Sequence, residues 1–206
     1  RPPLGPSRHD RDLFVFAPVQ EGVAEAFTSA VANRVAALTI GPGADPTSDL
    51  GPLIDRQGFA KVHAHVADAL HHGARLRVGG LPAEAPGAGA FFPPVVLEGI
   101  TSEMACWSEE TFGPLVGVRA FSDEREAISL GNDTPHGLAA YVFTADLERG
   151  RRVAAGLHFG HVGLNTSTGP TPEAPFGGMG LSGIGREGGL EGILEFCELQ
   201  TVPSPL

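Results

Sequence analysis

Short apolar runs alternate with helical patterns along most of this 206-residue chain, and this alternation constrains the fold more than any other feature. Runs rich in β-branched and aromatic residues predict strands at 14–16, 76–78, 95–97, 115–121, 139–143 and 162–165. Helical patterns predict helices at about 19–38, 56–72, 123–130 and 144–157. Strands and helices in this rhythm are typical of crossovers in a parallel sheet. The sequence therefore predicts an α/β fold, with a largely parallel twisted sheet and flanking helices.

Several boundaries of these elements follow from single residues. Pro18 predicts the end of the first strand, and Gly73 predicts the end of the second helix. Thr144 predicts the start of the last of these helices as its N-cap. Apolar residues facing inward are predicted at Val19, Val23, Phe27, Val31 and Val35 in the first helix, and at Phe59, Val62, Val66 and Leu70 in the second.

The segment Ser108–Pro114 combines two carboxylates, an aromatic ring and a turn. Gly113 and Pro114 stop any helix begun upstream, because Pro114 has no amide hydrogen and disfavours helical backbone at Gly113. The strand predicted at 115–121 follows directly. Glu109, Glu110 and Phe112 are therefore expected on a loop that leads into the sheet, where α/β proteins often place ligand-binding groups. An exposed acidic turn with one anchored aromatic residue is the alternative interpretation.

A second segment, residues 166–189, is dominated by Gly, Pro, Ser and Thr. Within it, Gly178–Gly183 matches the pattern G-x-G-x-x-G, but no predicted strand leads into it and no βαβ unit encloses it. The dinucleotide-binding fingerprint requires that context. We therefore expect a tight turn whose glycines permit close approach by substrate or by another stretch of backbone.

The histidines and cysteines of the chain do not form a recognisable metal or disulfide pattern. No two of the four histidines near the second helix have the four-residue spacing that lets two imidazoles share one ion, so they are interpreted as solvated surface residues: His63, His65, His71 and His72. Cys106 and Cys197 are too few for a disulfide framework and fit a reducing cytoplasm. Neither has the electropositive surroundings of a reactive thiolate.

The net charge of −10 argues against nucleic acid as a partner, because binding to its phosphates needs a basic surface. No apolar run is long enough to cross a membrane, and no apolar signal segment is present at the N-terminus. We therefore expect a soluble cytoplasmic protein with neither a nucleic-acid nor a membrane partner.

Six segments in order resemble the aldehyde dehydrogenase superfamily, with the greatest similarity to its succinate-semialdehyde type. They are Gly51–Ile54, Phe91–Leu97, Glu109–Pro114, Asn132–Ala139, Val162–Asn165 and Pro175–Glu187. The resemblance covers about residues 14–202 and corresponds to the C-terminal portion of the catalytic region of such enzymes. It implies residues 1–13 as an unmatched, poorly packed lead segment, 14–192 as a catalytic-type domain and 193–206 as a C-terminal oligomerisation strand.

The resemblance also implies roles for individual residues. Enzymes of this family oxidise an aldehyde through a cysteine thiolate, with NAD or NADP as hydride acceptor and a glutamate as base. Glu110 would accept hydrogen bonds from the ribose hydroxyls next to the nicotinamide, and Phe112 would brace the nicotinamide end. Phe176 would line the aldehyde tunnel. No catalytic residue and no metal ligand is assigned.

The chain lacks the Gly-Gln-x-Cys segment that carries the nucleophile in this family, and Arg1–Leu13 stand at the corresponding place. We therefore expect a portion of an aldehyde dehydrogenase that is inactive alone and binds no cofactor by itself. The alternative is a non-catalytic truncated domain that only folds and self-associates. In both cases the terminal segment Leu194–Val202, which alternates apolar and polar residues, is expected to pair as an edge strand in a homo-oligomer.

Overall fold

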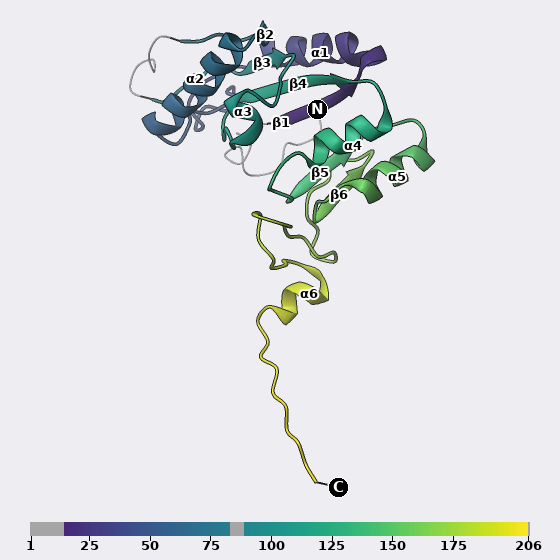
Figure 1. The fold of residues 1–206 in the computed structure, drawn as a ribbon. Coiled ribbons are helices and arrows are strands. Elements are labelled where there is room, and N and C mark those ends of the chain that lie inside the picture. Colours follow the sequence, from purple (N-terminus) through teal and green to yellow (C-terminus); the bar gives the residue numbers. More distant parts are fainter. Residues whose placement is uncertain (1–14, 83–88, 206) are drawn as a thin grey trace. The chain divides into compact units, whose positions relative to one another are not determined.

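The computed structural model describes residues 15–82 and 89–205, and the predicted lead segment 1–13 lies outside them. The chain divides into two compact units, Arg1–Asp123 and Glu124–Leu206, which are called the first and second units below (Figure 1). This division falls within residues 14–192, and the domain bounds expected from the sequence remain a prediction.

A four-stranded sheet forms the centre of the first unit, in the order β1-β4-β3-β2. β1 (Val15–Gln20) and β3 (Val95–Glu98) lie parallel to the central strand β4 (Leu115–Phe121), and β2 (Arg75–Val78) is antiparallel to β3. The register places Val95 opposite Leu115. The predicted α/β class and its mostly parallel sheet are confirmed, and the predicted bounds of β4 are those observed.

Pro18 lies inside β1, so the prediction that it ends this strand was wrong. Among the described strands, β1 lies at the sheet edge and pairs with β4 alone, where Pro18 stands opposite Arg119. A proline is tolerated on an edge because its missing amide hydrogen can face away from the sheet.

Helix α1 (Glu21–Ala36) packs on one face of this sheet with only part of the predicted stripe. Ala24, Val31 and Val35 contact the cluster that contains Val96 and Val118, whereas Val23 and Phe27 are exposed. Thr28 is also buried on this helix. Its hydroxyl can be buried without a large cost in free energy because it donates a hydrogen bond to the Ala24 carbonyl at 2.8 Å. A four-residue spacing drifts around a helix of 3.6 residues per turn, which explains the difference.

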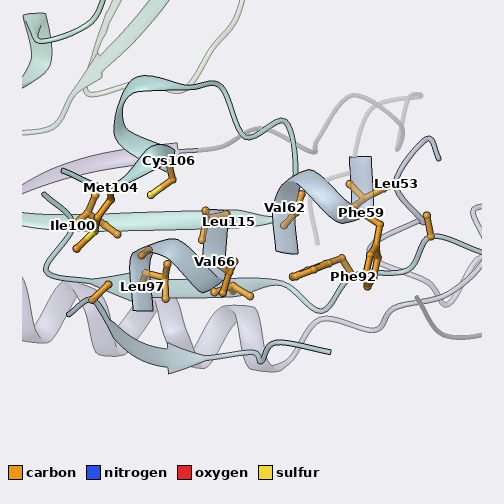
Figure 2. Close-up of a cluster of buried hydrophobic side chains, with 14 residues drawn as sticks. Leu53, Phe59, Val62, Val66, Phe92, Leu97, Ile100, Met104, Cys106 and Leu115 are labelled. Carbon is orange, nitrogen blue, oxygen red and sulfur yellow. The ribbon is translucent and has the colours of Figure 1, made fainter. Parts of the chain in front are cut away.

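The opposite face of the sheet carries the larger hydrophobic cluster, which joins α2 (Arg56–His71), the strands and α3 (Ala105–Ser108). Figure 2 shows Val62 and Val66 from α2, Leu97 from β3 and Leu115 from β4 gathered in this cluster. The predicted start of α2 is confirmed, and the helix ends at His71, one residue before the predicted end. Asp55 is the N-cap and accepts from the Gly58 amide, and Gly73 has a left-handed conformation after the helix.

The second unit has a two-stranded parallel sheet of β5 (Ala139–Val142) and β6 (His161–Leu164). Its helices are α4 (Glu124–Asn132), α5 (Leu147–Gly156) and α6 (Gly189–Leu194). The N-cap of α5 is Asp146, whose carboxylate accepts from the Arg149 amide at 3.0 Å, and not the predicted Thr144. Thr144 lies two residues upstream, where its hydroxyl accepts from the Asp146 amide at 3.2 Å.

The terminal segment does not form the predicted edge strand in this single chain. Leu194 ends α6, a turn follows, and residues 197–205 have no regular secondary structure. A strand needs a neighbouring strand to bond its backbone, and none of the strands in the described residues pairs with this stretch. Across the parts of the chain that the structure describes, no helix is both long enough and apolar enough to cross a membrane.

Candidate functional site

The acidic segment Glu109–Pro114 leads into β4, as the sequence predicted, and it follows α3, a short helix that the sequence patterns did not predict. It has no regular secondary structure and enters the central strand of the first unit's sheet at Leu115. The central strand is paired on both sides, so this loop is attached to a rigid part of the fold. Side chains on such a loop can be held in a defined geometry.

Thr111 anchors this segment to α2. Its side chain is buried, and its hydroxyl lies 2.9 Å from Nδ1 of His65. The other ring nitrogen of His65, Nε2, lies 3.4 Å from a carboxylate oxygen of Glu109. A buried hydroxyl without a partner would cost free energy, so this contact ties the loop to the helix.

His65 corrects the interpretation of the helix histidines as solvated. It is only 4% exposed, whereas His71 and His72 are exposed and His63 is half-buried. The sequence did contain a signal, because position 65 falls three residues after Val62 and four before Ala69 on the buried face. A histidine at such a position requires a polar partner inside the fold.

Phe112 and Glu110, the neighbours of this anchor in the sequence, are both exposed. Phe112 is 60% exposed and has a left-handed backbone with φ 48°, and Glu110 is exposed. Such a conformation costs a residue other than glycine about 1–2 kcal/mol, so neighbouring contacts must hold it in place. Burial of Thr111 between two exposed neighbours therefore displays a carboxylate and an aromatic ring on the same short loop.

Gly113 follows Phe112 and is buried against α2. A Cβ atom at this position would overlap Cγ2 of Val62. Glycine is needed here for close approach, and α2 therefore contacts the loop on both sides of Phe112.

Cys106 lies in the core below this loop and is unsuited to nucleophilic chemistry. It is fully buried, and burial raises the pKa of its thiol to about 11, with the negative charge of Asp68 adding to the shift. Asp68 also accepts from the Ala105 amide at 2.7 Å, at the start of α3. Cys197, the other free cysteine, is exposed on the terminal segment.

Phe176 belongs to the second unit, where its backbone is held by Glu187. Each of the two residues donates its amide to the carbonyl of the other at 2.7 Å. The Phe176 ring is half-buried and lies 5.7 Å from the ring of His161, which in turn lies 5.9 Å from the ring of Tyr141. These three rings form one aromatic cluster over β5 and β6.

The glycine-rich segment after Phe176 approaches other backbone closely, as expected. Met179 and Leu181 donate their amides to the carbonyls of Gly137 and Pro135, both at 2.9 Å. The Arg186 guanidinium donates to the carbonyls of Gly178 and Gly185, both at 2.8 Å. Gly180 and Gly183 have positive φ, so Gly178–Gly183 is a series of turns and does not open a helix.

Two hollows in the surface of the first unit lie apart from the predicted site residues. One of about 500 Å³ is lined by Ile40, Gly41, Pro42, Phe91, Phe92 and Pro93, and one of about 350 Å³ lies around Pro52–Arg56. Neither is lined by Glu110 or Phe112. Within residues 15–82 and 89–205, no group of three or more His, Cys, Asp or Glu side chains is placed to hold a metal ion.

Comparison with known proteins identifies the family. Residues 17–202 match the aldehyde dehydrogenase family. The chain is 46% identical over 180 residues to a non-phosphorylating aspartate-semialdehyde dehydrogenase of Halomonas elongata, covering 87% of this chain and 36% of that protein. It is 43% identical over 182 residues to an NADP(+) succinate-semialdehyde dehydrogenase of Escherichia coli, covering 88% of this chain and 37% of that protein.

Solved structures give the same result. An oxidoreductase from Marinobacter aquaeolei superposes with a TM-score of 0.87 and 60% identity, over 92% of this chain and 39% of that chain. A succinate-semialdehyde dehydrogenase from Burkholderia pseudomallei superposes with a TM-score of 0.81 and 44% identity, over 87% of this chain and 36% of that chain. The chain thus spans a little over a third of the length of the relatives it matches. It belongs to the aldehyde dehydrogenase family.

Proposed function

We propose that this chain is a portion of an NAD(P)-dependent aldehyde dehydrogenase that oxidises an aldehyde to a carboxylic acid. In this proposal the first unit supplies groups for the cofactor, and the second unit supplies a group for the aldehyde. The observation that carries it is the loop Glu109–Pro114, where a buried Thr111 displays Glu110 and Phe112 to the outside. Because the chain belongs to the aldehyde dehydrogenase family, we assign these two exposed side chains to cofactor binding.

Glu110 and Phe112 are the proposed cofactor-binding residues. A carboxylate only accepts hydrogen bonds, so Glu110 is suited to the two hydroxyls of a ribose. The exposed ring of Phe112 provides a flat apolar surface against which a nicotinamide ring can rest. When bound, NAD(P)+ would accept the hydride of the aldehyde carbon.

Phe176 is the proposed tunnel residue for the aldehyde. Its ring is fixed by the backbone pairing with Glu187 and by contact with His161, which suits a wall that must keep its shape. Relatives of this chain are named aspartate-, glutarate- and succinate-semialdehyde dehydrogenases, and we propose a semialdehyde as the substrate class.

The reaction itself needs a nucleophile that neither cysteine of this chain provides. A thiolate must attack the aldehyde carbon, the hydride must leave for the cofactor, and water must hydrolyse the resulting thioester. Cys106 is buried with a raised pKa, and Cys197 lies on the exposed terminal segment. We therefore propose that this chain alone is inactive, binds no cofactor, and depends on a cysteine from further polypeptide.

The terminal segment is the proposed oligomerisation contact. Phe196, Leu199 and Val202 are exposed, and residues 197–205 carry no strand pairing of their own. A second copy could supply the missing partner strand. The two free cysteines fit a reducing cytoplasm as the proposed setting.

Turnover assays test the proposal. The purified chain is incubated with succinate semialdehyde and with NAD+ or NADP+, and no reduced cofactor is expected. Trp107 fluorescence should be unchanged by micromolar NAD+, because one loop gives too few contacts to offset the cost of association. Acid formation that disappears on replacing Cys106 or Cys197 would contradict the proposal.

The DNA upstream of the codon for Arg1 separates this proposal from the alternative of a non-catalytic domain. A continuous reading frame with a Gly-Gln-x-Cys segment supports a dehydrogenase, and that longer protein should oxidise a semialdehyde. In it, Glu110→Ala or Phe112→Ala should raise the KM for the cofactor. A stop codon in that frame would favour the alternative, in which folding and self-association are the only roles.

A further inference from the structure

Helix α2 contacts the acidic loop through two of its residues and the start of α3 through a third. Val62, His65 and Asp68 are spaced three residues apart and therefore share a face. Val62 packs against Gly113, His65 contacts Thr111, and Asp68 accepts from the amide of Ala105 at 2.7 Å. These contacts run from the first residue of α3 to Gly113, the residue before Pro114.

The imidazole of His65 has a defined orientation in this arrangement. The carboxylate of Glu109 can only accept, so Nε2 of His65 must donate to it across the 3.4 Å contact. In the neutral tautomer with the proton on Nε2, Nδ1 is the acceptor and the Thr111 hydroxyl is the donor across the 2.9 Å contact. The Glu109 side chain is 62% exposed, so the buried contact with Thr111 is the stronger tether.

Phe112 lies between Thr111 and Gly113, the two residues of the acidic loop that contact α2. Thr111 is tied to His65 on one side, and Gly113 is packed against Val62 on the other. A left-handed residue other than glycine persists only where the surrounding structure holds it. The contacts of Thr111 and Gly113 with α2 therefore hold the backbone on both sides of Phe112, whose φ is 48°.

We propose that His65 is a positioning residue for the loop that carries Glu110 and Phe112. Through the Thr111 hydroxyl it keeps Phe112 in the left-handed conformation and keeps Glu110 and Phe112 turned outward. That this geometry serves the cofactor rests on the function proposed above. His65 touches no reacting group and acts only through Thr111.

Nuclear magnetic resonance of the chain tests the positioning itself. The HN–Hα coupling and the 13Cα and 13Cβ shifts of Phe112 report its backbone conformation, and Trp107 fluorescence during denaturation reports whether the first unit is folded. Thr111→Val and His65→Leu each remove one partner, and both should move the Phe112 signals from left-handed toward extended values.

Two conservative variants serve as matched controls. Thr111→Ser keeps the hydroxyl, and His65→Asn keeps an acceptor next to Cγ where Nδ1 stands. Both should retain the wild-type Phe112 signals. If a folded Thr111→Val protein keeps the Phe112 signals unchanged, His65 has only a structural role and the proposal is overturned. The Thr111→Val protein is sufficient for this test, whether or not His65→Leu folds.

Kinetics of the dehydrogenase of full length test the link to the cofactor. Thr111→Val should raise the KM for NAD(P)+ about three- to tenfold, the size of one hydrogen bond, with the KM for the aldehyde unchanged. If the Phe112 signals move and the KM for the cofactor does not, the positioning role stands. The cofactor role assigned to Glu110 and Phe112 would then be the part that fails.

Discussion

Gly113 is a position where only glycine fits, because Val62 of α2 lies against its backbone. Its backbone lies where any β-carbon would overlap Val62, and it is buried where the acidic loop packs against α2. Gly22, in α1, has no atom within contact distance of the same added carbon. An added methyl group would therefore clash at Gly113 and meet open space at Gly22.

Gly113→Ala should destabilise the first unit by about 1–3 kcal/mol, because the added methyl overpacks a filled core. Gly22→Ala is the matched control and should stabilise by up to about 1 kcal/mol, because alanine loses less backbone entropy in a helix. Urea unfolding followed by Trp107 fluorescence measures both. An unchanged midpoint for Gly113→Ala would show that Val62 can move aside.

The two cysteines should differ sharply in reactivity toward alkylating reagents. With a pKa of about 11, only about one Cys106 thiol in a thousand is ionised at pH 8, and the core covers it. Iodoacetamide at pH 8 should therefore modify Cys197 and leave Cys106 intact, as measured by peptide mass spectrometry. Both should react in guanidinium chloride. Equal labelling of the two in native protein would mean that the core opens readily.

At the scale of elements, Arg77 links a helix to two strands. From β2 it donates to Glu25 on α1 at 2.6 Å and 2.9 Å and to Glu98 on β3 at 2.7 Å. The hydrogen bonds from Arg77, and secondly from Ser29, lower the pKa of Glu25 from 4.5 to about 2. This surface network connects elements that burial of Val96 and Val118 already brings together.

A carboxyl whose pKa is lowered by folding stabilises the fold above its unfolded pKa and loses that contribution as the pH falls through the folded value. The contribution of Glu25 should therefore be complete above about pH 4.5 and vanish toward pH 2. Arg77→Gln should return the pKa of Glu25 toward 4.5 and remove this pH dependence. Carboxyl carbon shifts during an acid titration measure it.

Arg75→Gln is the control for this titration, because Arg75 pairs with Glu98 and leaves the bonds between Arg77 and Glu25 in place. It should change the Glu25 pKa little. The loss of stability caused by Arg77→Gln should be small and should weaken in salt, since the Glu25 side chain faces solvent. A Glu25 that titrates near 4.5 in the unmodified chain would contradict the bonded geometry.

At the scale of the whole molecule, the terminal segment carries apolar side chains that the described residues do not cover. Phe196 is 94% exposed and Leu199 is fully exposed. Contiguous exposed apolar residues commonly mark a contact with another molecule. Ile54 in the first unit is 95% exposed and stands as a comparison for apolar exposure elsewhere.

We expect the chain to self-associate as its concentration rises, because pairing of two terminal segments removes these side chains from water. Replacing Phe196, Leu199 and Val202 by serine should give a monomer, whereas Ile54→Ser should associate like the unmodified chain. Sedimentation velocity at several concentrations measures the difference. Association that survives the triple replacement would place the contact elsewhere.

The rhythm of strands and helices could be predicted from the sequence, because burial on one face imposes a period that local residues must follow. The start of α2, the bounds of β4 and the place of the acidic loop directly before a strand came from such patterns. The family resemblance rested on short motifs in order and is confirmed over residues 17–202. Local chemistry was enough for these features.

The tertiary structure alone decided the features that depend on distant partners. Pro18 is allowed in β1 because that strand lies at the sheet edge, and the terminal segment forms no strand because none of the described strands lies beside it. His65 is buried because Thr111, 46 residues later, supplies a hydroxyl at 2.9 Å. A sequence pattern reports which side chains prefer burial, but a buried polar group also needs a partner, and only the folded chain brings that partner within hydrogen-bonding distance.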